Sequence, residues 1–271
     1  MSDSEDEASL SLDAVFTEPP RPPTPEPTIA TYTRTIHPQG DDWSKINIRL
    51  VGSHPLWGHH LWNASRAFAT FLETHRALYA HRSVLELGAG GGLPGIVAAL
   101  NGAANVILTD YPDAALLENL HYNVSQNVPD VAKERIHVEG YIWGHNVAPL
   151  FKIQSQNAPT PGFDLIIMSD LVFNHSQHDA LLKTAEDALA RPISTGHEST
   201  ESFPDPCVLV FYTHHRPHLA HRDMEFFEKA TKRGWICQEI LTQKFPLMFP
   251  DDSGDEEVRS TVHGWKLMRP V

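Results

Sequence analysis

Residues 83–95 of this chain read S-V-L-E-L-G-A-G-G-G-L-P-G. The apolar run that ends at Leu87 is strand-like, the glycines form a tight turn, and a helical pattern over residues 93–100 follows, with Pro94 in its first turn. Proline is tolerated there because the first N–H groups of a helix have no partner inside the helix. A strand, a glycine turn and a helix in this order indicate the first unit of a doubly wound α/β sheet, where bare backbone can approach a nucleotide.

The spacing of the glycines separates two kinds of nucleotide. The dinucleotide-binding motif G-x-G-x-x-G, begun at Gly88, requires a glycine at the position where this chain has Leu93. The pattern present is E-x-G-x-G-x-G, which is carried by Glu86, Gly88, Gly90 and Gly92. This pattern resembles motif I of the seven-strand S-adenosylmethionine (SAM) methyltransferases. A SAM site is therefore favoured over a NAD site and over an empty pocket.

An acidic residue closes the second expected strand. Residues 105–109 read N-V-I-L-T, and Asp110 follows them, about 20 residues after Gly88. An acid at this spacing lies at the end of the second strand, where it binds ribose hydroxyls. The glycine turn and Asp110 together predict a nucleoside-binding crevice.

The charge balance limits the classes of partner. The chain has 271 residues, with 21 Lys and Arg against 34 Asp and Glu, and its net charge is −13. This length accommodates one α/β domain of about 230 residues with extra segments. Because an acidic protein lacks the positive surface that nucleic acids require, we expect no DNA or RNA substrate, and basic peptides are favoured instead.

Cysteine use and hydropathy indicate a cytoplasmic protein without a membrane segment. Cys207 and Cys237 lie in apolar, strand-like runs, which is typical of buried free thiols in a reducing compartment. No apolar run reaches about 18 residues, and the acidic N-terminus lacks the apolar core of a secretion signal. The 17 histidines are not accompanied by thiolates or paired acids at ligand spacing, so we expect no metal site.

The chain divides into a tail and one domain. Residues 1–28 are acidic and then proline-rich, so we expect a disordered or polyproline-like tail that either solubilises the protein or docks a basic partner. Residues 29–271 form the expected SAM-dependent domain. Alternating apolar residues over 29–36 and 45–51 predict a hairpin at its start. An acidic loop, residues 250–257, is either solvated or attracts a cationic substrate.

Polar residues follow the fourth expected strand. Residues 163–169 are almost continuously apolar, as in a parallel strand buried on both faces, and Asp170 and Asn174 come soon after. Because ligands bind beyond the carboxyl ends of such strands, both side chains are candidates for positioning the substrate. The alternative for Asp170 is an N-cap of the next helix, expected to run to about residue 190.

Two tryptophans are candidate walls of the cofactor pocket. Trp143 follows the third expected strand, residues 135–139, at a position where an indole can stack on a purine. Trp57 lies in a P-L-W-G turn ahead of a helix expected to end near Tyr79. For each tryptophan, burial in the hydrophobic core is the alternative. A further helix is expected after Asp113, a plausible N-cap.

Five longer motifs occur along the chain in this order. They read G-S-H-P-L-W-G-H-H-L-W-N, V-L-E-L-G-A-G, T-D-Y-P-D, E-G-Y-I-W-G and S-D-L-V-F-N-H. With H-R-P after the fifth strand, they resemble the family-16-type seven-strand SAM methyltransferases from about residue 30 to the C-terminus. The resemblance implies a Rossmann-like α/β fold: a mostly parallel seven-stranded sheet with helices on both faces, an antiparallel last strand and an N-terminal hairpin extension.

The resemblance also implies which residues contact SAM. They are Trp57, Gly88, Ala89, Gly90, Asp110, Trp143 and Ser169. The family has D-x-x-Y after the fourth strand, whereas this chain has Asp170 to Phe173, so a hydroxyl is missing.

Within that family, the chain resembles the fungal enzymes that methylate translation elongation factor 1-alpha. The resemblance implies a protein N-methyltransferase whose acceptors are the N-terminal glycine of that factor and the lysine next to it. An α-amine with a pKa of about 7.7–8.0 is already partly neutral near pH 7.4, whereas a lysine must lose its proton against about 3 pH units. We expect a monomer. A small-molecule N-methyltransferase of the nicotinamide type and a SAM-binding adaptor without turnover are the alternatives.

Overall fold

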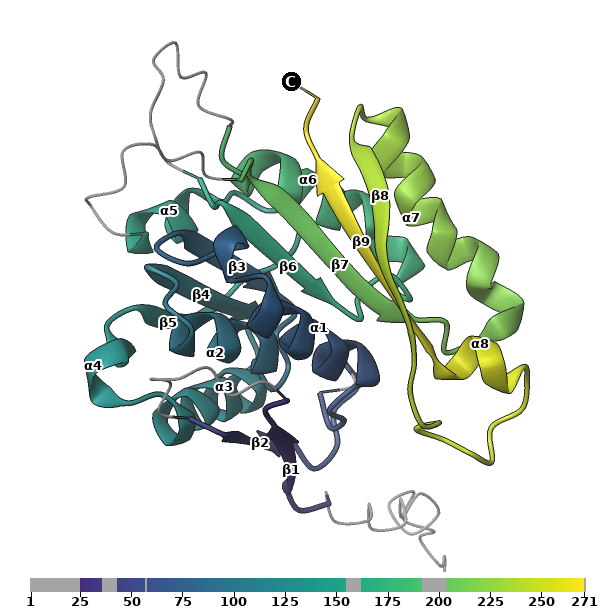
Figure 1. Cartoon of the computed structure of the whole chain (residues 1–271), viewed down its shortest axis with the longest axis horizontal. Helices are drawn as coiled ribbons and strands as arrows, with labels where there is room; N and C mark the ends of the chain where they lie inside the picture. Colours follow the sequence, from purple (N-terminus) through teal and green to yellow (C-terminus); the bar gives the residue numbers. More distant parts are fainter. Residues whose placement is uncertain (1–24, 36–42, 57, 155–161, 192–203, 271) are drawn as a thin grey trace, which may run out of the picture.

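A seven-stranded sheet forms the centre of the protein (Figure 1). The computed structural model describes residues 25–35, 43–56, 58–154, 162–191 and 204–270. The strand order is β5-β4-β3-β6-β7-β9-β8, in which β9 runs antiparallel to β7 and β8 and the neighbours from β5 to β7 are parallel. The strands are β3 (Ser83–Leu87), β4 (Asn105–Asp110), β5 (Ile136–Gly140), β6 (Leu165–Ser169), β7 (Cys207–Thr213), β8 (Ile236–Lys244) and β9 (Thr261–Met268).

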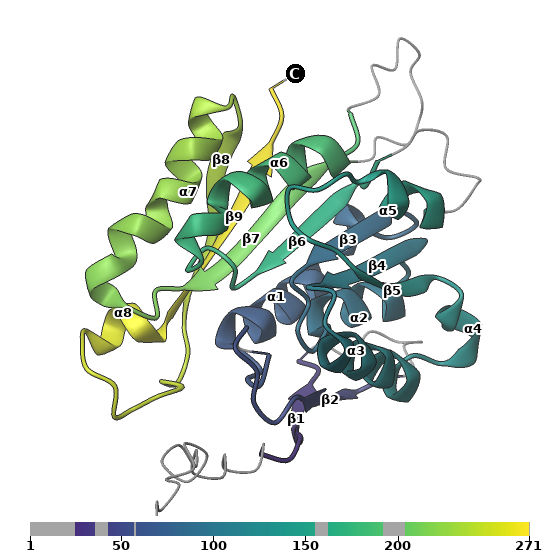
Figure 2. The same ribbon diagram turned by 180° about the vertical axis from the view of Figure 1, so that it is seen from behind.

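Helices cover both faces of this sheet. Figure 1 shows α1 (Asn63–Thr74), α2 (Leu93–Leu100) and α3 (Ala114–Asn127) on one face, and Figure 2 shows α5 (Ala148–Ile153), α6 (His178–Ala188) and α7 (Ala220–Lys232) on the other. Alternate strand residues point to opposite layers: Ile167 packs with the first group and Ile166 with the second. Both faces of the inner strands β3, β4, β6 and β7 are buried, which explains their continuously apolar sequences, whereas the edge strand β8 is largely exposed.

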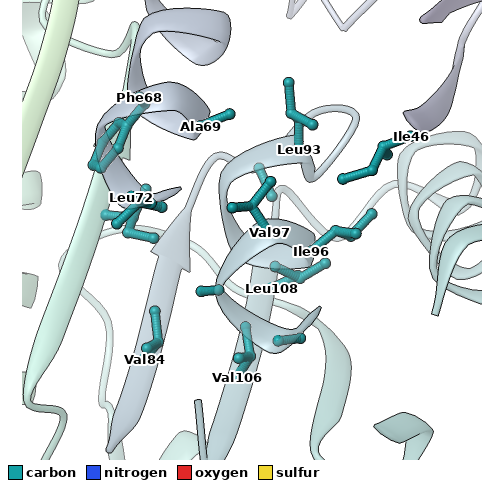
Figure 3. Packing of buried hydrophobic residues seen from close by; sticks show 14 of the residues in the cluster. Ile46, Phe68, Ala69, Leu72, Val84, Leu93, Ile96, Val97, Val106 and Leu108 are labelled. Carbon is teal, nitrogen blue, oxygen red and sulfur yellow. The ribbon is translucent and has the colours of Figure 1, made fainter. Parts of the chain in front are cut away.

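The layer on the α1–α2 side is a close-packed hydrophobic cluster. In Figure 3, Phe68 and Leu72 of α1 and Val97 of α2 lie over the sheet residues Val84 and Val106. All five side chains are fully buried, with an exposed fraction of 0%. This packing fixes α2, and with it the glycine turn that leads into it, against β3 and β4.

An N-terminal hairpin extends this layer. It consists of β1 (Thr28–Thr33) and β2 (Lys45–Leu50), which pair antiparallel. Ile46 and Ile48 of β2 are fully buried in the same cluster as α2. The alternation of the sequence therefore predicted the hairpin correctly, with apolar residues facing the core.

A buried asparagine joins this hairpin to α3 and to the glycine turn. The Asn123 side chain accepts a hydrogen bond from the backbone N–H of Arg49 (2.8 Å) and donates to the Arg49 carbonyl (2.9 Å) and to the Gly91 carbonyl (3.1 Å). Asn127, one helical turn later, pairs in the same way with the backbone of Asn47. These amides take the place of a neighbouring strand at the edge of β2.

We expect Asn123→Ala to destabilise the protein by about 2–4 kcal/mol, because two or more buried backbone groups lose their partner at about 1–3 kcal/mol each. Urea denaturation followed by circular dichroism measures this difference. Gln126→Ala on the exposed side of α3 is the matched control and should change the free energy of unfolding by less than about 0.5 kcal/mol. Equal effects of the two variants would contradict the role of Asn123.

Several expected boundaries need correction. The helix expected to end near Tyr79 stops at Thr74, and a separate 3₁₀ turn, Arg76–Leu78, follows it. The strand expected over 29–36 ends at Thr33. Three short helices were not expected, since they are too brief for a periodic pattern to show. They are α4 (Asp130–Lys133), α5 (Ala148–Ile153) and α8 (Glu256–Ser260).

Other expectations are confirmed or lie outside the described residues. Asp113 caps α3, accepting hydrogen bonds from the N–H groups of Ala115 and Leu116. Most of the expected tail, residues 1–24, is outside the described part of the chain, and the extent of the domain, residues 29–271, stays a prediction. None of the helices in the described ranges is long and apolar enough to span a membrane.

Candidate active site

The carboxyl ends of the parallel strands meet at one edge of the sheet, and an exposed apolar side chain follows three of them. Tyr111 follows β4 and is 51% exposed, Ile142 follows β5 and is 38% exposed, and Phe173 follows β6 and is 39% exposed. This edge is where open α/β sheets bind ligands.

The glycine turn after β3 has open space in front of it. Gly90 has φ +54°, a left-handed conformation, and a Cβ at this position would meet no atom of the described residues within 4 Å. At Gly88 (φ +60°), in contrast, a Cβ would lie 2.7 Å from Leu171 and 3.0 Å from the indole of Trp143. The backbone is thus accessible at Gly90 and covered by side chains at Gly88. A nucleoside can therefore approach the backbone at Gly90, where no Cβ is in the way.

Asp110 at the end of β4 contacts this turn. One carboxylate oxygen accepts a hydrogen bond from the Gly90 N–H (2.7 Å) and the other from the Tyr111 N–H (2.7 Å). Burial raises the pKa of Asp110, and the two N–H donors oppose this shift. The sequence therefore correctly predicted that the acid and the glycine turn, about 20 residues apart, lie side by side.

Glu86, the acid of the glycine motif, is fully buried behind the turn. Its Oε2 accepts a hydrogen bond from the N–H of Gly95 in the first turn of α2 (2.8 Å), and its Oε1 has no hydrogen-bond partner in the described part of the chain. Burial raises the pKa of Glu86 to about 8. The carboxyl group therefore holds α2 in place and is largely protonated at neutral pH.

Stability should fall as the pH rises from about 5 to 8, because the folded state binds the Glu86 proton more tightly than the unfolded chain does. Glu86→Gln removes this ionisation and keeps a carbonyl for the Gly95 N–H. We expect the stability of the wild type relative to this variant to fall by about 2–3 kcal/mol between pH 5.5 and 8. Urea denaturation at both pH values measures this, and a pH-independent difference would contradict a buried, protonated Glu86.

The other residues expected to bind the cofactor lie around the same turn, except Trp57, which is outside the described residues. Trp143 is half-buried and its six-membered ring lies against Gly88. Ala89 is buried, and its N–H donates to the Thr109 carbonyl, tying the turn to β4 (2.9 Å). At the end of β6, the Ser169 hydroxyl is buried and has no hydrogen-bond partner among the residues that the structure describes.

These features fit a nucleoside cofactor at this edge. The turn beside Gly90 is open, Asp110 can accept hydrogen bonds from ribose hydroxyls, and the unpartnered Ser169 hydroxyl is available to a ligand. The indole of Trp143 near the turn can stack on the face of a purine.

Asp170 follows β6 in a conformation that is rare for residues other than glycine. Its φ is +60°, in the left-handed region, and its carboxylate is almost completely buried. The carboxylate accepts a hydrogen bond from the Thr213 N–H (3.3 Å) and pairs with Nε2 of His215 (2.8 Å). Such strain persists where surrounding contacts enforce it, often at functional sites. The N-cap alternative is wrong, since α6 begins only at His178.

Asn174, the second expected substrate residue, makes its hydrogen bonds within its own turn. The side-chain oxygen accepts from the Ser176 hydroxyl (3.0 Å), and the backbone N–H donates to the Leu171 carbonyl (3.1 Å). The residue is half-buried. The structure therefore joins Asp170 to His215, whereas Asn174 shapes the loop that carries Phe173.

Sequence reasoning missed two functional candidates at this edge. His215 lies two residues beyond the end of β7, and Trp62 immediately precedes α1; their rings pack 4.7 Å apart. His215 is the histidine of the H-R-P motif that follows the fifth strand, but neither the motif nor its position at a strand end was assigned a role. Among the described residues, no group of three or more histidine, cysteine or acidic side chains could hold a metal ion.

Two neighbouring histidines pair with a carboxylate on α7. The buried carboxylate of Asp223 on α7 pairs with Nε2 of His175 (2.7 Å) and Nδ1 of His214 (2.6 Å). His175 follows β6 and His214 follows β7. Asp223 therefore ties together the two turns that carry Asp170 and His215.

Comparison with known proteins agrees with this geometry. Residues 44–232 match the family described as lysine methyltransferase. The chain is 45% identical over 276 residues to the "Protein N-terminal and lysine N-methyltransferase EFM7" of Cryptococcus neoformans, covering 99% of this chain and 91% of that protein. It is 42% identical to the efm7 protein of Schizosaccharomyces pombe, covering 95% of each chain.

Solved structures share the fold at low sequence identity. A putative SAM-dependent methyltransferase from Streptococcus mutans aligns with a TM-score of 0.55 at 16% identity, over 90% of this chain and 56% of that one. A putative RNA methyltransferase from Pyrococcus horikoshii aligns with a TM-score of 0.52 at 18% identity, over 81% and 91%. The predicted Rossmann-like sheet and its family resemblance are confirmed, and the chain belongs to the lysine methyltransferase family.

Proposed function

We propose that this protein is a SAM-dependent N-methyltransferase that modifies the N-terminal α-amine and a lysine side chain of a protein. The observation that carries the proposal is the near full-length identity of 45% to a relative named for both activities. The methyl donor is SAM, whose sulfonium supplies an electrophilic methyl group. The enzyme's own contribution is then to hold an acceptor amine in line with that group.

The residues at the strand edge have distinct roles toward SAM in this proposal. Asp110 binds the ribose hydroxyls, and Trp143 covers the purine face. The backbone of Gly88, Ala89 and Gly90 approaches the nucleoside, and Ser169 contacts it from β6. Trp57 is proposed to form a further part of the wall of the cofactor pocket. The support is the open face of Gly90, the adjacent carboxylate of Asp110 and the unpartnered hydroxyl of Ser169.

The acceptor amine is assigned to the neighbouring turns. Asp170 lies at the tip of β6, next to Ser169, so a donor methyl group and an amine can meet there. Its negative charge favours binding of an ammonium group. Asn174 is proposed to accept a hydrogen bond from the substrate amine.

The proposed substrate is translation elongation factor 1-alpha, through its N-terminal glycine and the adjacent lysine, and the proposed setting is a monomer in the cytoplasm. The net charge of −13 supports a cationic peptide as substrate. The exposed acidic residues in the segment between β8 and β9, which includes the start of α8, also support a cationic substrate. These include Asp251, Asp252, Asp255, Glu256 and Glu257, all exposed.

Intact-protein mass spectrometry of elongation factor 1-alpha from cells that lack this gene tests the proposal. We expect the loss of N-terminal and lysine methylation in those cells and its restoration by purified enzyme with SAM. Tritiated SAM and a cell lysate distinguish the alternatives. A labelled small molecule would indicate a nicotinamide-type enzyme, and no labelled product would indicate an adaptor.

A further inference from the structure

The nearly buried carboxylate of Asp170 pairs with an imidazole ring that is itself partly exposed. The Asp170 side chain is 4% exposed, whereas that of its partner His215 is 26% exposed. An ionised carboxylate can only accept hydrogen bonds, so Nε2 of His215 carries the proton between them. In the neutral ring Nδ1 is then the acceptor, and it makes no hydrogen bond with any residue in the described ranges.

Aromatic side chains from separate segments surround this ring. Trp62, ahead of α1, lies 4.7 Å from His215 at an interplanar angle of 61°, and Phe173 lies 6.4 Å away at 81°. Phe249, on the loop between β8 and β9, packs 6.0 Å from Trp62. Rings of this kind attract an ammonium group through their faces and exclude water from it. A cation next to His215 would thus be bound in its charged form.

Two contacts hold the β8–β9 loop over this site. The side chain of Asn63, at the start of α1, donates to the carbonyl of Pro246 (2.9 Å). The buried guanidinium of Arg259 donates to the carbonyl of Phe249 (2.7 Å). Phe249 is therefore fixed relative to Trp62 by its own backbone.

We propose that His215, oriented by Asp170, accepts the proton that the bound ammonium of the substrate must lose before methyl transfer. This inference rests on the proposed function. The ammonium N–H bond breaks, its proton moves to Nδ1 of His215, and the ring becomes an imidazolium opposite Asp170. The lone pair left on nitrogen then takes the methyl group, SAM leaves as neutral S-adenosylhomocysteine, and the positive charge ends on the methylated amine.

The surrounding charges suit this role. Burial opposes a proton on His215, but the charge and hydrogen bond of Asp170, together with the charge of Asp223, raise the pKa of the ring overall. Arg216 acts in the opposite direction. Behind Trp62, burial lowers the pKa of His60, which favours the neutral form of that ring.

Loss of the proton acceptor should lower kcat/KM far more for lysine than for the α-amine. Without it, the enzyme can use only substrate that is already neutral in solution. At pH 7.4 this is about a third to a fifth of an α-amine but about one thousandth of a lysine. Asp170 remains in His215→Asn to attract the ammonium. The variant should therefore lose about 3–5-fold in kcat/KM on the α-amine and about 10³-fold on lysine.

The test uses peptides that begin Gly-Lys, with either the α-amine or the lysine blocked by acetylation. Rates of the full-length wild type and of His215→Asn are measured by mass spectrometry from pH 6.5 to 9.5. The lysine defect should shrink to about 25-fold at pH 9, and the α-amine defect should nearly vanish. His218→Asn, an exposed histidine three residues away, should behave as the wild type.

Two further measurements keep the outcome clear if the variant is unstable. SAM affinity by calorimetry should be unchanged in His215→Asn, and nitrogen-15 NMR of the wild type should show the Nε2–H tautomer of His215. Equal losses for both acceptors at every pH, or an Nδ1–H tautomer, would overturn the inference. If the wild type methylates neither peptide, the proposed function itself fails.

Discussion

Replacing Asp170 with asparagine is expected to lower kcat/KM by about 10³-fold on lysine and by at least about 5-fold on the α-amine, while the Kd for SAM changes less than about threefold. Asparagine keeps the size of the side chain and tolerates φ +60°, so the turn should survive. It removes the charge that binds the ammonium and orients His215, and loss of the carboxylate from an aspartate–histidine pair typically costs several powers of ten in rate. Asp170→Ala should be at least as severe, because alanine is strained at this φ.

Single-turnover kinetics and calorimetry with SAM distinguish this role from simple loss of the site. The expected pattern is slow methyl transfer with intact cofactor binding. Parallel losses of rate and of SAM affinity would instead make Asp170 part of the cofactor pocket. Asp205→Asn, an exposed aspartate outside the site, is the control for a change of net charge and should leave both quantities unaltered.

Replacing Asp110 with alanine is expected to raise the Kd for SAM by about 10²-fold or more. Hydrogen bonds from two ribose hydroxyls to a charged acceptor contribute about 1.5–3 kcal/mol each, so losing both corresponds to at least this factor. The change also releases the N–H of Gly90, which holds the glycine turn against β4. The protein should therefore lose most of the thermal stabilisation that SAM confers on the wild type.

Calorimetry and thermal unfolding with and without SAM measure this effect. Asp130→Ala, at a fully exposed aspartate on α4, is the matched control and should keep the wild-type Kd. An Asp110→Ala protein that folds and binds SAM as tightly as the wild type would exclude the proposed crevice at the end of β4.

Local patterns in the sequence were enough to establish the α/β sheet, the hairpin and the acids at the strand ends. A strand followed directly by glycines and a helix has few structural alternatives, and an acid that closes a parallel strand must lie at the shared carboxyl edge. Asp110 and Asp170 were predicted on this basis and lie there. The roles of all site residues stay proposals, and Trp57 lies outside the described residues.

The partners of these acids depend on contacts between distant segments, which no local pattern encodes. His215 meets Asp170 across 45 residues, and Phe249 reaches Trp62 only because the β8–β9 loop folds back over α1. The burial that raises the pKa of Glu86 likewise arises from α2 packing over β3. Hydrophobic periodicity fixes which elements form and which faces they bury. Side-chain pairing, and hence the chemistry of the acceptor site, is set only when those elements pack together.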